Sequence, residues 1–328
     1  MIGAFLLFYL LILCMERTKI ETVIYMKATV LSEILEKLNR GESAELIISD
    51  GDQTYIRKFS KNARLILLGC GHVSVDVYRL ARTLDFDIVA VDDRPSFASY
   101  ERFPDARIIC DDFISAIEKL NITENDYVCV LTRGHLWDMQ CIRSVLSGTV
   151  PYYLGLISSS KRVKGLFEIL EQEGFDRDVV NKIHAPIGLK IGAMTTAEIA
   201  VSICAELIQE RHKKYVKLRE NELLQTNVNT ELLRYLAQSK EPRAMVTVLS
   251  SSGSTPAKSG SMMAVNSLGL VSGTVGGGCG EASAIMKARR IIGTGESAVL
   301  TIEMDNEVAA DNDMVCGGSM TVLIEDIT

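Results

Sequence analysis

The stretch Arg64-Leu-Ile-Leu-Leu-Gly-Cys-Gly-His-Val-Ser-Val-Asp-Val-Tyr-Arg-Leu-Ala-Arg82 decides the fold of the middle of this chain. Its short apolar run ends in Gly69, Cys70 and Gly71, and apolar residues recur at helical spacing from Val73 onward. This order predicts a strand, a tight glycine turn and a helix. Such a turn directs backbone N–H groups and the positive end of the helix dipole toward one point, which favours a bound phosphate.

The chain continues as a regular alternation of strands and helices. The alternation predicts a doubly wound parallel sheet that is covered by helices on both faces. The rigid segment 185–192 is expected to close the sheet, and a helix capped by Thr195 or Thr196, with Glu198 in its first turn, follows it. Strands are expected over 64–69, 87–92, 107–110, 126–131 and 151–157, and helices over 72–84, 112–120, 136–147 and 159–173.

A second, smaller domain begins after Pro242, where strands outnumber helices, and this pattern predicts an α+β domain. We place the two domains at 61–212 and 241–328, and we interpret the charged segment 213–240 as a helical linker that ends in a helix. In the smaller domain, strands are expected over 244–250, 262–265, 269–275, 298–304 and 320–325, with one helix over 281–292.

The N-terminal part of the chain has two segments. Residues 1–26 are interpreted as an extended or non-native N-terminus, with translation expected to start at Met15 or Met26, of which Met26 is favoured because an amphipathic helix begins there. The apolar run 2–14 is too short for a membrane span and unlike a signal peptide; a weak membrane anchor is the alternative. Residues 27–60 are interpreted as a helix–hairpin unit around Asp50-Gly51. This unit is too small to hold a core alone and is expected to dock on the part of the chain that comes after it.

The composition narrows the classes of function. The chain has 328 residues, a net charge of −7 and few aromatic residues. Nucleic-acid binding needs a basic face, so nucleic acid is not expected as a partner. The eight cysteines form no CxxC pair, and several lie inside apolar runs. This usage is typical of reduced thiols in a cytoplasmic protein, and no stable membrane insertion is expected.

The glycine turn and the strand after it predict a nucleotide-type site. Asp92 ends the second strand, where an acidic residue holds a ribose hydroxyl in dinucleotide-binding folds, and Arg94 beside it would suit a 2′-phosphate. Ser74 departs from the fingerprint, which has glycine or alanine there. The alternative is a turn that binds nothing or another phosphate compound. After the fourth strand, His135 and Asp138 could share a proton, orient a ligand or be structural.

Two cysteine–glycine motifs in the C-terminal domain indicate a functional site more specifically than the glycine turn at Gly69 does. The stretch Ser272-Gly-Thr-Val-Gly-Gly-Gly-Cys-Gly-Glu281 places Cys279 at the expected N-terminus of a helix, a position that favours the thiolate. The stretch Met314-Val-Cys-Gly-Gly318 places Cys316 beside two glycines. A tight turn with two incidental thiols is the alternative. Lys258, in a loop of serine, glycine and proline, could contact an anion or lie in an exposed turn.

These motifs resemble one known family. Gly-Cys-Gly-His-Val, Val-Asp-Asp-Arg-Pro and Ala-Pro-Ile-Gly-Leu resemble the Rossmann domain of the xanthine dehydrogenase accessory family (XdhC/CoxI). The two cysteine–glycine motifs, with Gly253-Ser-Thr-Pro, resemble the other domain of that family. The domain order is apparently swapped, because the cysteine domain usually comes first. Four residues depart from the family's pattern: Arg133, Gly134, Ser158 and Lys190.

The resemblance implies a Rossmann-like α/β domain plus a smaller α+β domain, and an accessory protein for the molybdenum cofactor (molybdopterin). Such a protein binds the cofactor, supports its sulfuration and delivers it to a xanthine dehydrogenase-type molybdenum hydroxylase, with a cysteine desulfurase as a further partner. A homodimer is expected as the commonest oligomer. The alternative function is an NAD(P)-dependent oxidoreductase that uses the Rossmann site and redox cysteines.

The candidate residues fall into two sets, and none is assigned a catalytic role. Cys279 and Cys316 are the candidates for contact with molybdenum or transferred sulfur. The candidate cofactor-binding residues are Lys258, Gly276, Gly277, Gly278, Cys279, Glu281, Cys316, Gly317 and Gly318 in the C-terminal domain, and Gly69, Gly71, His72, Asp92 and His135 in the Rossmann-like domain.

Overall fold

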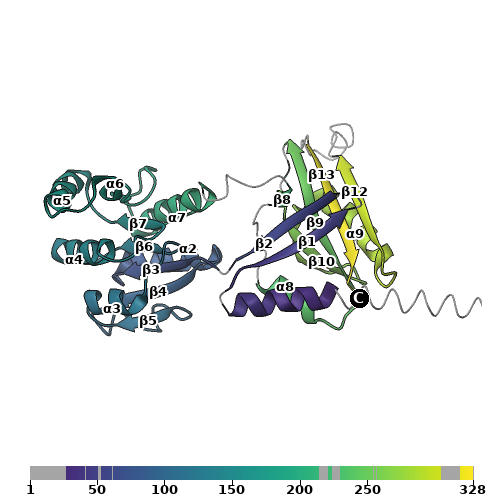
Figure 1. The fold of residues 1–328 in the computed structure, drawn as a ribbon, viewed down its shortest axis with the longest axis horizontal. Coiled ribbons are helices and arrows are strands. Elements are labelled where there is room, and N and C mark those ends of the chain that lie inside the picture. The colour runs from purple at the N-terminus through teal and green to yellow at the C-terminus, as the bar shows by residue number, and fades with distance from the viewer. Residues whose placement is uncertain are drawn as a thin grey trace, which may run out of the picture. The chain divides into compact units, whose positions relative to one another are not determined.

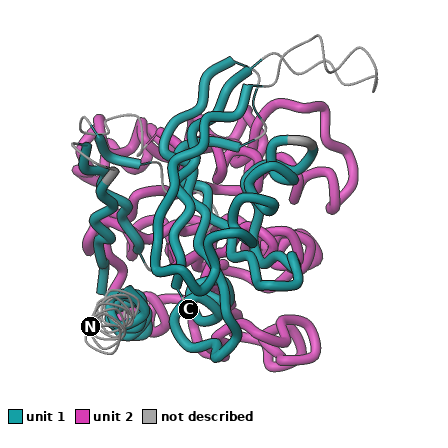
Figure 2. Tube along the Cα trace, turned by 90° about the vertical axis from the view of Figure 1, so that its right-hand side faces the viewer, with its two compact units in different colours: residues 1–61, 217–328 teal, residues 62–216 magenta. Residues whose placement is uncertain are grey.

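The computed structural model describes residues 27–327 except 41, 51–52, 61, 214–220, 224–229, 254, 256 and 304–317. The chain forms two compact units (Figure 2). One unit is continuous and spans residues 62–216, and the other combines residues 1–61 with residues 217–328. Residues 1–26, with the expected start at Met26, lie outside the described residues.

The continuous unit is the predicted doubly wound domain (Figure 1). Its five strands are all parallel and follow the order β5-β4-β3-β6-β7, so the strand order reverses between β3 and β6. The strands are β3 (Arg64–Leu68), β4 (Asp87–Asp92), β5 (Arg107–Cys110), β6 (Tyr127–Val130) and β7 (Tyr153–Leu156). The helices are α2 (His72–Thr83), α3 (Phe113–Leu120), α4 (His135–Leu146), α5 (Ser160–Gln172), α6 (Arg177–Val180) and α7 (Thr196–Lys213).

Both faces of this sheet are buried, and the side chains of β3 show why its sequence is continuously apolar. Leu65 and Leu67 belong to the core on one face, whereas Ile66 and Leu68 belong to the core on the other. All four side chains are fully buried. Because successive residues of a strand point to opposite faces, a sheet covered on both sides leaves no position for a polar side chain.

The segment after α6 closes the sheet as predicted. His184 pairs in parallel with Gly155, and the Ile187 N–H donates to the Leu156 carbonyl at 2.9 Å. The helix after this segment has a reciprocal cap at its N-terminus: the Glu198 N–H donates to Thr195 Oγ1, and the Glu198 carboxylate accepts from the Thr195 N–H. This is the capping box that the sequence indicates.

The discontinuous unit is built on a five-stranded antiparallel sheet of order β11-β10-β9-β13-β12. Along β9, Val246 and Val248 face one core together with α9, whereas Met245 and Leu249 face a second core. The expected α+β domain is therefore present, with its sheet covered on both faces. Its elements are β9 (Arg243–Gly253), β10 (Met262–Asn266), β11 (Val271–Gly273), α9 (Gly278–Ile291), β12 (Ser297–Glu303) and β13 (Gly318–Asp326).

The helix–hairpin unit packs on this C-terminal sheet. A helix over residues 27–39 and the strands β1 (Ala44–Asp50) and β2 (Gln53–Phe59) contribute to the second core. Leu35 and Phe59 share that core with Met245 of β9, far away in the sequence. The sequence left the docking partner open because the apolar face of a short helix does not encode what it packs against.

The predicted helical linker over 213–240 is wrong in part. Its described residues contain a strand, β8 (Glu222–Leu223), which pairs in parallel with Ile56 and Arg57 of β2. The helix at its end, α8 (Thr230–Gln238), buries Leu232, Leu233 and Leu236 in the second core. The amphipathic pattern of α8 belongs to a packed helix, so β8 and α8, the described elements of this segment, are part of the domain rather than of a connector.

Among the described residues, no helix is both long enough and apolar enough to cross a membrane. The five cysteines whose thiols are described are free: Cys110 is exposed, and Cys70, Cys129, Cys141 and Cys204 are buried. Buried free cysteines behave as small apolar side chains, as the sequence indicates.

We expect Leu35→Ala to lower the free energy of unfolding by about 2–5 kcal/mol, because it removes a buried side chain from the second core. Val30→Ala on the same helix is the matched control, since Val30 is 39% exposed and its change should stay below about 1 kcal/mol. Chemical denaturation followed by circular dichroism measures both. Equal effects of the two substitutions would contradict the packing of this helix on the C-terminal sheet.

Candidate functional site

The glycine turn after β3 forms because two connections of the Rossmann-like domain pass close to each other. Gly69 has a φ of +105°, and a Cβ atom there would lie 2.4 Å from the carbonyl oxygen of Leu131. Ser74, which departs from the fingerprint, is fully buried, and its hydroxyl donates to the Gly69 carbonyl at 2.6 Å. The serine thus fits against the turn through a hydrogen bond.

Asp92 is buried beside this turn, and both of its carboxylate oxygens have partners within the chain. Oδ2 accepts from the Cys70 N–H at 2.8 Å. The Arg94 guanidinium donates to both oxygens, at 2.8 Å and 2.9 Å. The sequence predicts that this carboxylate holds a ribose hydroxyl, whereas here it holds the glycine turn and an arginine.

Two more arginines join the connections at the carboxyl edge of the sheet. Arg102 donates to the Cys70 carbonyl at 3.1 Å, and Arg133 makes two hydrogen bonds to Asp93, at 2.5 Å and 2.8 Å. These hydrogen bonds from Arg133 lower the pKa of Asp93 to about 2. Sequence reasoning did not find Arg102, because it lies in a loop with no motif of its own. Arg133, seen there only as a departure from the family pattern, is an ion-pair partner.

The other Rossmann-side candidates lie at the same edge. Gly71 is the N-cap of α2 and makes no side-chain cap hydrogen bond, and His72 begins the helix and is exposed. His135 begins α4, and its Nδ1 lies 4.0 Å from Asp138 Oδ2, which is beyond hydrogen-bonding distance. Asp138 instead accepts a 2.5 Å hydrogen bond from the Thr132 hydroxyl. Burial raises the pKa of the Asp138 carboxyl, and the Thr132 hydrogen bond opposes that shift.

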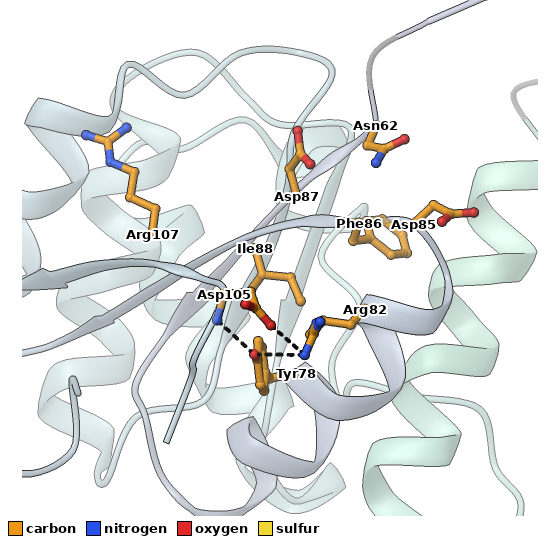
Figure 3. A pocket seen from close by; sticks show the side chains of 9 residues that line it. All are labelled: Asn62, Tyr78, Arg82, Asp85, Phe86, Asp87, Ile88, Asp105 and Arg107. Atoms are coloured by element: carbon orange, nitrogen blue, oxygen red, sulfur yellow. Dashed lines mark hydrogen bonds and ion pairs between the residues drawn. The ribbon is translucent and has the colours of Figure 1, made fainter. Parts of the chain in front are cut away.

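A cavity of about 390 Å³ lies at the opposite edge of this sheet (Figure 3). It is lined by Asp87 and Arg107, which begin β4 and β5, and by Arg82 near the end of α2. Arg82 is paired there with Asp105 at 2.7 Å. Parallel α/β sheets bind ligands at the carboxyl ends of their strands, so this cavity is not part of the candidate site.

The second glycine turn, at the N-terminus of α9, is shaped by three consecutive residues with positive φ. Gly276, Gly277 and Gly278 have φ angles of +117°, +72° and +67°. Side chains other than glycine rarely adopt this conformation, so the run of glycines is required by the backbone. Gly277 is the N-cap of α9 and makes no side-chain cap hydrogen bond. Among the described residues other than its two chain neighbours, none has an atom within 4 Å of the Cβ position at Gly277, which leaves room for a ligand on this side of the backbone.

Glu281 holds this turn in place. Its Oε2 accepts from the Thr274 hydroxyl at 2.6 Å and from the N–H groups of Val275 and Gly277, each at 3.0 Å. Burial raises the pKa of this carboxyl, but the three hydrogen bonds together outweigh burial and leave the pKa below its ordinary value. Its observed contacts therefore shape the proposed cofactor-binding turn.

The cysteine motifs are only partly described. Cys279 occupies the second position of α9, as the sequence indicates, whereas Cys316 and Gly317 lie outside the described residues. Gly318 begins β13 and pairs with Gly253 of β9, so the first residue of the Gly-Ser-Thr-Pro motif lies beside the last residue of the second cysteine–glycine motif. Lys258 is exposed in the turn before β10. No group of three or more potential metal ligands occurs among the described residues.

The comparisons with known families agree with this arrangement of two domains. The family model described as the XdhC Rossmann domain matches residues 65–207. The model described as the XdhC and CoxI family matches residues 236–303. The chain belongs to the XdhC and CoxI family. In this XdhC/CoxI chain the Rossmann match precedes the other match, which is the order that the motifs indicate.

Two curated relatives share part of this XdhC/CoxI chain. A probable xanthine dehydrogenase subunit of Bacillus subtilis (strain 168) is 32% identical over 170 residues, which are 49% of this chain and 48% of that protein. The uncharacterized protein YqeB of Escherichia coli (strain K12) is 29% identical over 160 residues, which are 48% of this chain and 29% of that protein. The chain thus spans half or less of the length of these relatives.

A solved structure of a xanthine dehydrogenase from Bacillus halodurans is 28% identical, with a TM-score of 0.45. The similarity covers 51% of this chain and 48% of that one.

We expect Gly69→Ala to lower the free energy of unfolding by at least about 2 kcal/mol, because the new Cβ would meet the Leu131 carbonyl in an unfavourable φ region. Gly71→Ala is the matched control. Its Cβ meets nothing within 4 Å, and its effect should stay below about 1 kcal/mol. Thermal unfolding monitored by circular dichroism compares the two variants. Similar losses would argue against the close approach at Gly69.

Glu281→Gln tests the clamp on the second glycine turn. Because the pKa of Glu281 is lowered, its stabilising contribution should be present near neutral pH and be lost as the pH falls below the ordinary value of 4.5. We expect the variant to be about 1 kcal/mol less stable at pH 7 and equal to the parent in acid. Urea denaturation at a series of pH values measures this, with Glu296→Gln at an exposed position as the control. A constant difference across the pH range would contradict the clamp.

Proposed function

We propose that this protein is an accessory protein that binds the molybdenum cofactor (molybdopterin) as cargo, supports its sulfuration and delivers it to a xanthine dehydrogenase-type molybdenum hydroxylase. The observation that carries the proposal is the glycine turn at the start of α9, in a chain of the XdhC and CoxI family. Its three positive-φ glycines and its clamp by Glu281 hold an open backbone turn directly before Cys279.

The residues of this turn fit such a cargo. An open glycine turn at a helix N-terminus suits an anionic phosphate, because N–H groups and the helix dipole both favour negative charge. The Gly277 N–H already donates to Glu281, so Gly278, the first residue of α9, would supply that contact. A cysteine in the first turn of a helix favours the thiolate, and soft thiolates suit molybdenum or transferred sulfur. Cys279 and Cys316 would therefore face the metal or the sulfur.

The partners follow from the same proposal. The name of the Bacillus subtilis relative connects it to xanthine dehydrogenase, which supports a hydroxylase of that type as the recipient. A cysteine desulfurase would supply the sulfur, and a homodimer is the expected assembly.

The alternative function is an NAD(P)-dependent oxidoreductase. That function needs Asp92 to hold a ribose hydroxyl, but this carboxylate is buried and accepts from Cys70 and Arg94. A nucleotide would have to displace these hydrogen bonds, so the geometry favours the accessory function. Titration with NADH and NADPH, followed by fluorescence and turnover, discriminates between the two functions.

Protein purified without oxygen should retain a pterin that is detectable by fluorescence after oxidation. Cys279→Ser and Cys316→Ser should each lower cofactor delivery to the apo-hydroxylase by at least about tenfold, since each removes a proposed thiolate contact. Cys110→Ser, at an exposed thiol of the Rossmann domain, is the matched control and should leave delivery unchanged. Failure of the parent protein to bind pterin would overturn the proposal. Undiminished delivery by both cysteine variants would instead indicate a scaffold that does not touch the cofactor.

A further inference from the structure

We propose that β12, an edge strand of the C-terminal sheet, pairs antiparallel with β12 of a second copy of this chain about a two-fold axis. β12 spans Ser297–Glu303 and lies at one end of its sheet, where β13 is its neighbour on one side. Among the described residues, no strand pairs with its other side. The inference deepens the proposed function, on whose homodimer it rests, but it does not require cofactor binding.

The backbone of β12 alternates between groups that bond β13 and groups that point away from it. Just before the strand, the Asp326 N–H donates to the Glu296 carbonyl at 3.1 Å, which fixes the phase of this alternation. In an antiparallel ladder every second residue bonds the neighbouring strand, so Ala298, Leu300 and Ile302 bond β13. The residues whose N–H and C=O groups are directed outward are Ser297, Val299, Thr301 and Glu303.

The open side of β12 lacks the features that protect the edges of natural sheets. Such edges are short or carry lysine, proline or bulges. β12 has seven residues without proline or a basic side chain, and its only charge is Glu303 at its end. The strand at the opposite end of the same sheet, β11, has three residues. The edge of β12 therefore favours pairing with a further strand.

The phase of the outward groups fits a second copy of the same strand. When two β12 strands lie antiparallel and overlap fully, Ser297 lies opposite Glu303 of the second copy, and Val299 lies opposite Thr301. All of these residues direct their N–H and C=O groups outward, so each pair can share two hydrogen bonds. The register that pairs the whole strand is thus one that the backbone hydrogen bonds allow.

The side chains fit the same register. At its centre, Leu300 lies opposite Leu300 of the second copy. Leu300 is half-buried at the border of the core beneath α9, so pairing would extend that apolar core across the two copies. Glu303 lies opposite the uncharged Ser297, so the register opposes no like charges. Val299, which is 41% exposed, lies opposite Thr301, and both side chains are β-branched.

Sedimentation velocity of the full chain at a series of concentrations measures the association. One paired strand buries less area than a standard interface, so we expect a reversible dimer with a Kd in the micromolar range. Val299→Lys should raise the Kd by at least about tenfold, because it places two lysines diagonally across the two-fold axis. Val271→Lys, on β11 and 45% exposed, is the matched control and should leave the Kd unchanged.

Thr301→Pro tests the outward hydrogen bonds. The Thr301 N–H points away from β13, so proline removes a donor from the proposed interface and leaves the ladder to β13 intact. We expect the Kd to rise by at least about tenfold while circular dichroism shows a folded protein. A parent protein that stays monomeric at about 100 µM, or a Kd that neither edge variant changes, would overturn the inference.

Leu300→Cys tests the register. In a non-hydrogen-bonded antiparallel pair the opposing Cα atoms lie about 4.5 Å apart, a distance that a disulfide spans. In a Cys110→Ser background, mild oxidation should link position 300 of the two copies, as identified by mass spectrometry. Ala298→Cys is the matched control, because two such positions would lie about 13 Å apart along the strands. Equal linking at both positions would contradict the register.

The outcomes separate this interface from the proposed function. A dimer that persists in both Val299→Lys and Thr301→Pro would use another surface, which overturns the β12 pairing and leaves the proposed homodimer. A dimer through β12 in a protein that retains no pterin would support this interface while the proposed function fails.

Discussion

Where β3 ends, the chain passes so close to the β6–α4 connection that only a residue without a Cβ fits. Gly69 takes a φ of +105° there, and the Leu131 carbonyl occupies the space that a side chain would need. This contact joins the carboxyl ends of the two strands between which the strand order reverses. The position of the α2 N-terminus, the burial of Asp92 and the entry into α4 all depend on that close approach.

At the carboxyl edge of the parallel sheet, aspartates and arginines pair with one another. Asp92 bridges the glycine turn and Arg94, and Asp93 binds Arg133 on the neighbouring connection. Both carboxylates therefore have partners within the chain: Asp92 accepts from the Cys70 N–H and from Arg94, and Asp93 accepts from Arg133. Asp138 lies one connection further along, in the first turn of α4, and its carboxylate accepts from the Thr132 hydroxyl.

The discontinuous unit also has a sheet that is buried on both faces and a glycine turn that is held by a carboxylate. Its central strand β9 has apolar residues on both faces, so the sheet needs a cover on each side. α9 covers one face, and the helix–hairpin segment with α8 covers the other. In the second glycine turn, Glu281 of the helix accepts from the N–H groups of Val275 and Gly277, and these hydrogen bonds hold the turn before Cys279.

The sequence by itself determined most of the helices and strands, the parallel sheet, the α+β class of the second domain and the two glycine turns, because periodicity and glycine positions record local backbone geometry and which faces are buried. It also indicated the family through its long cysteine–glycine motifs. Only the tertiary structure decided that the segment 27–59 and α8 belong to the C-terminal unit, and that Asp92 pairs with Arg94 rather than remaining available to a ligand. Those outcomes depend on contacts between residues far apart in the chain. The sequence shows that an apolar helix face must be buried and that a buried carboxylate must be hydrogen-bonded. Which residues make those contacts depends on how the helices and strands pack.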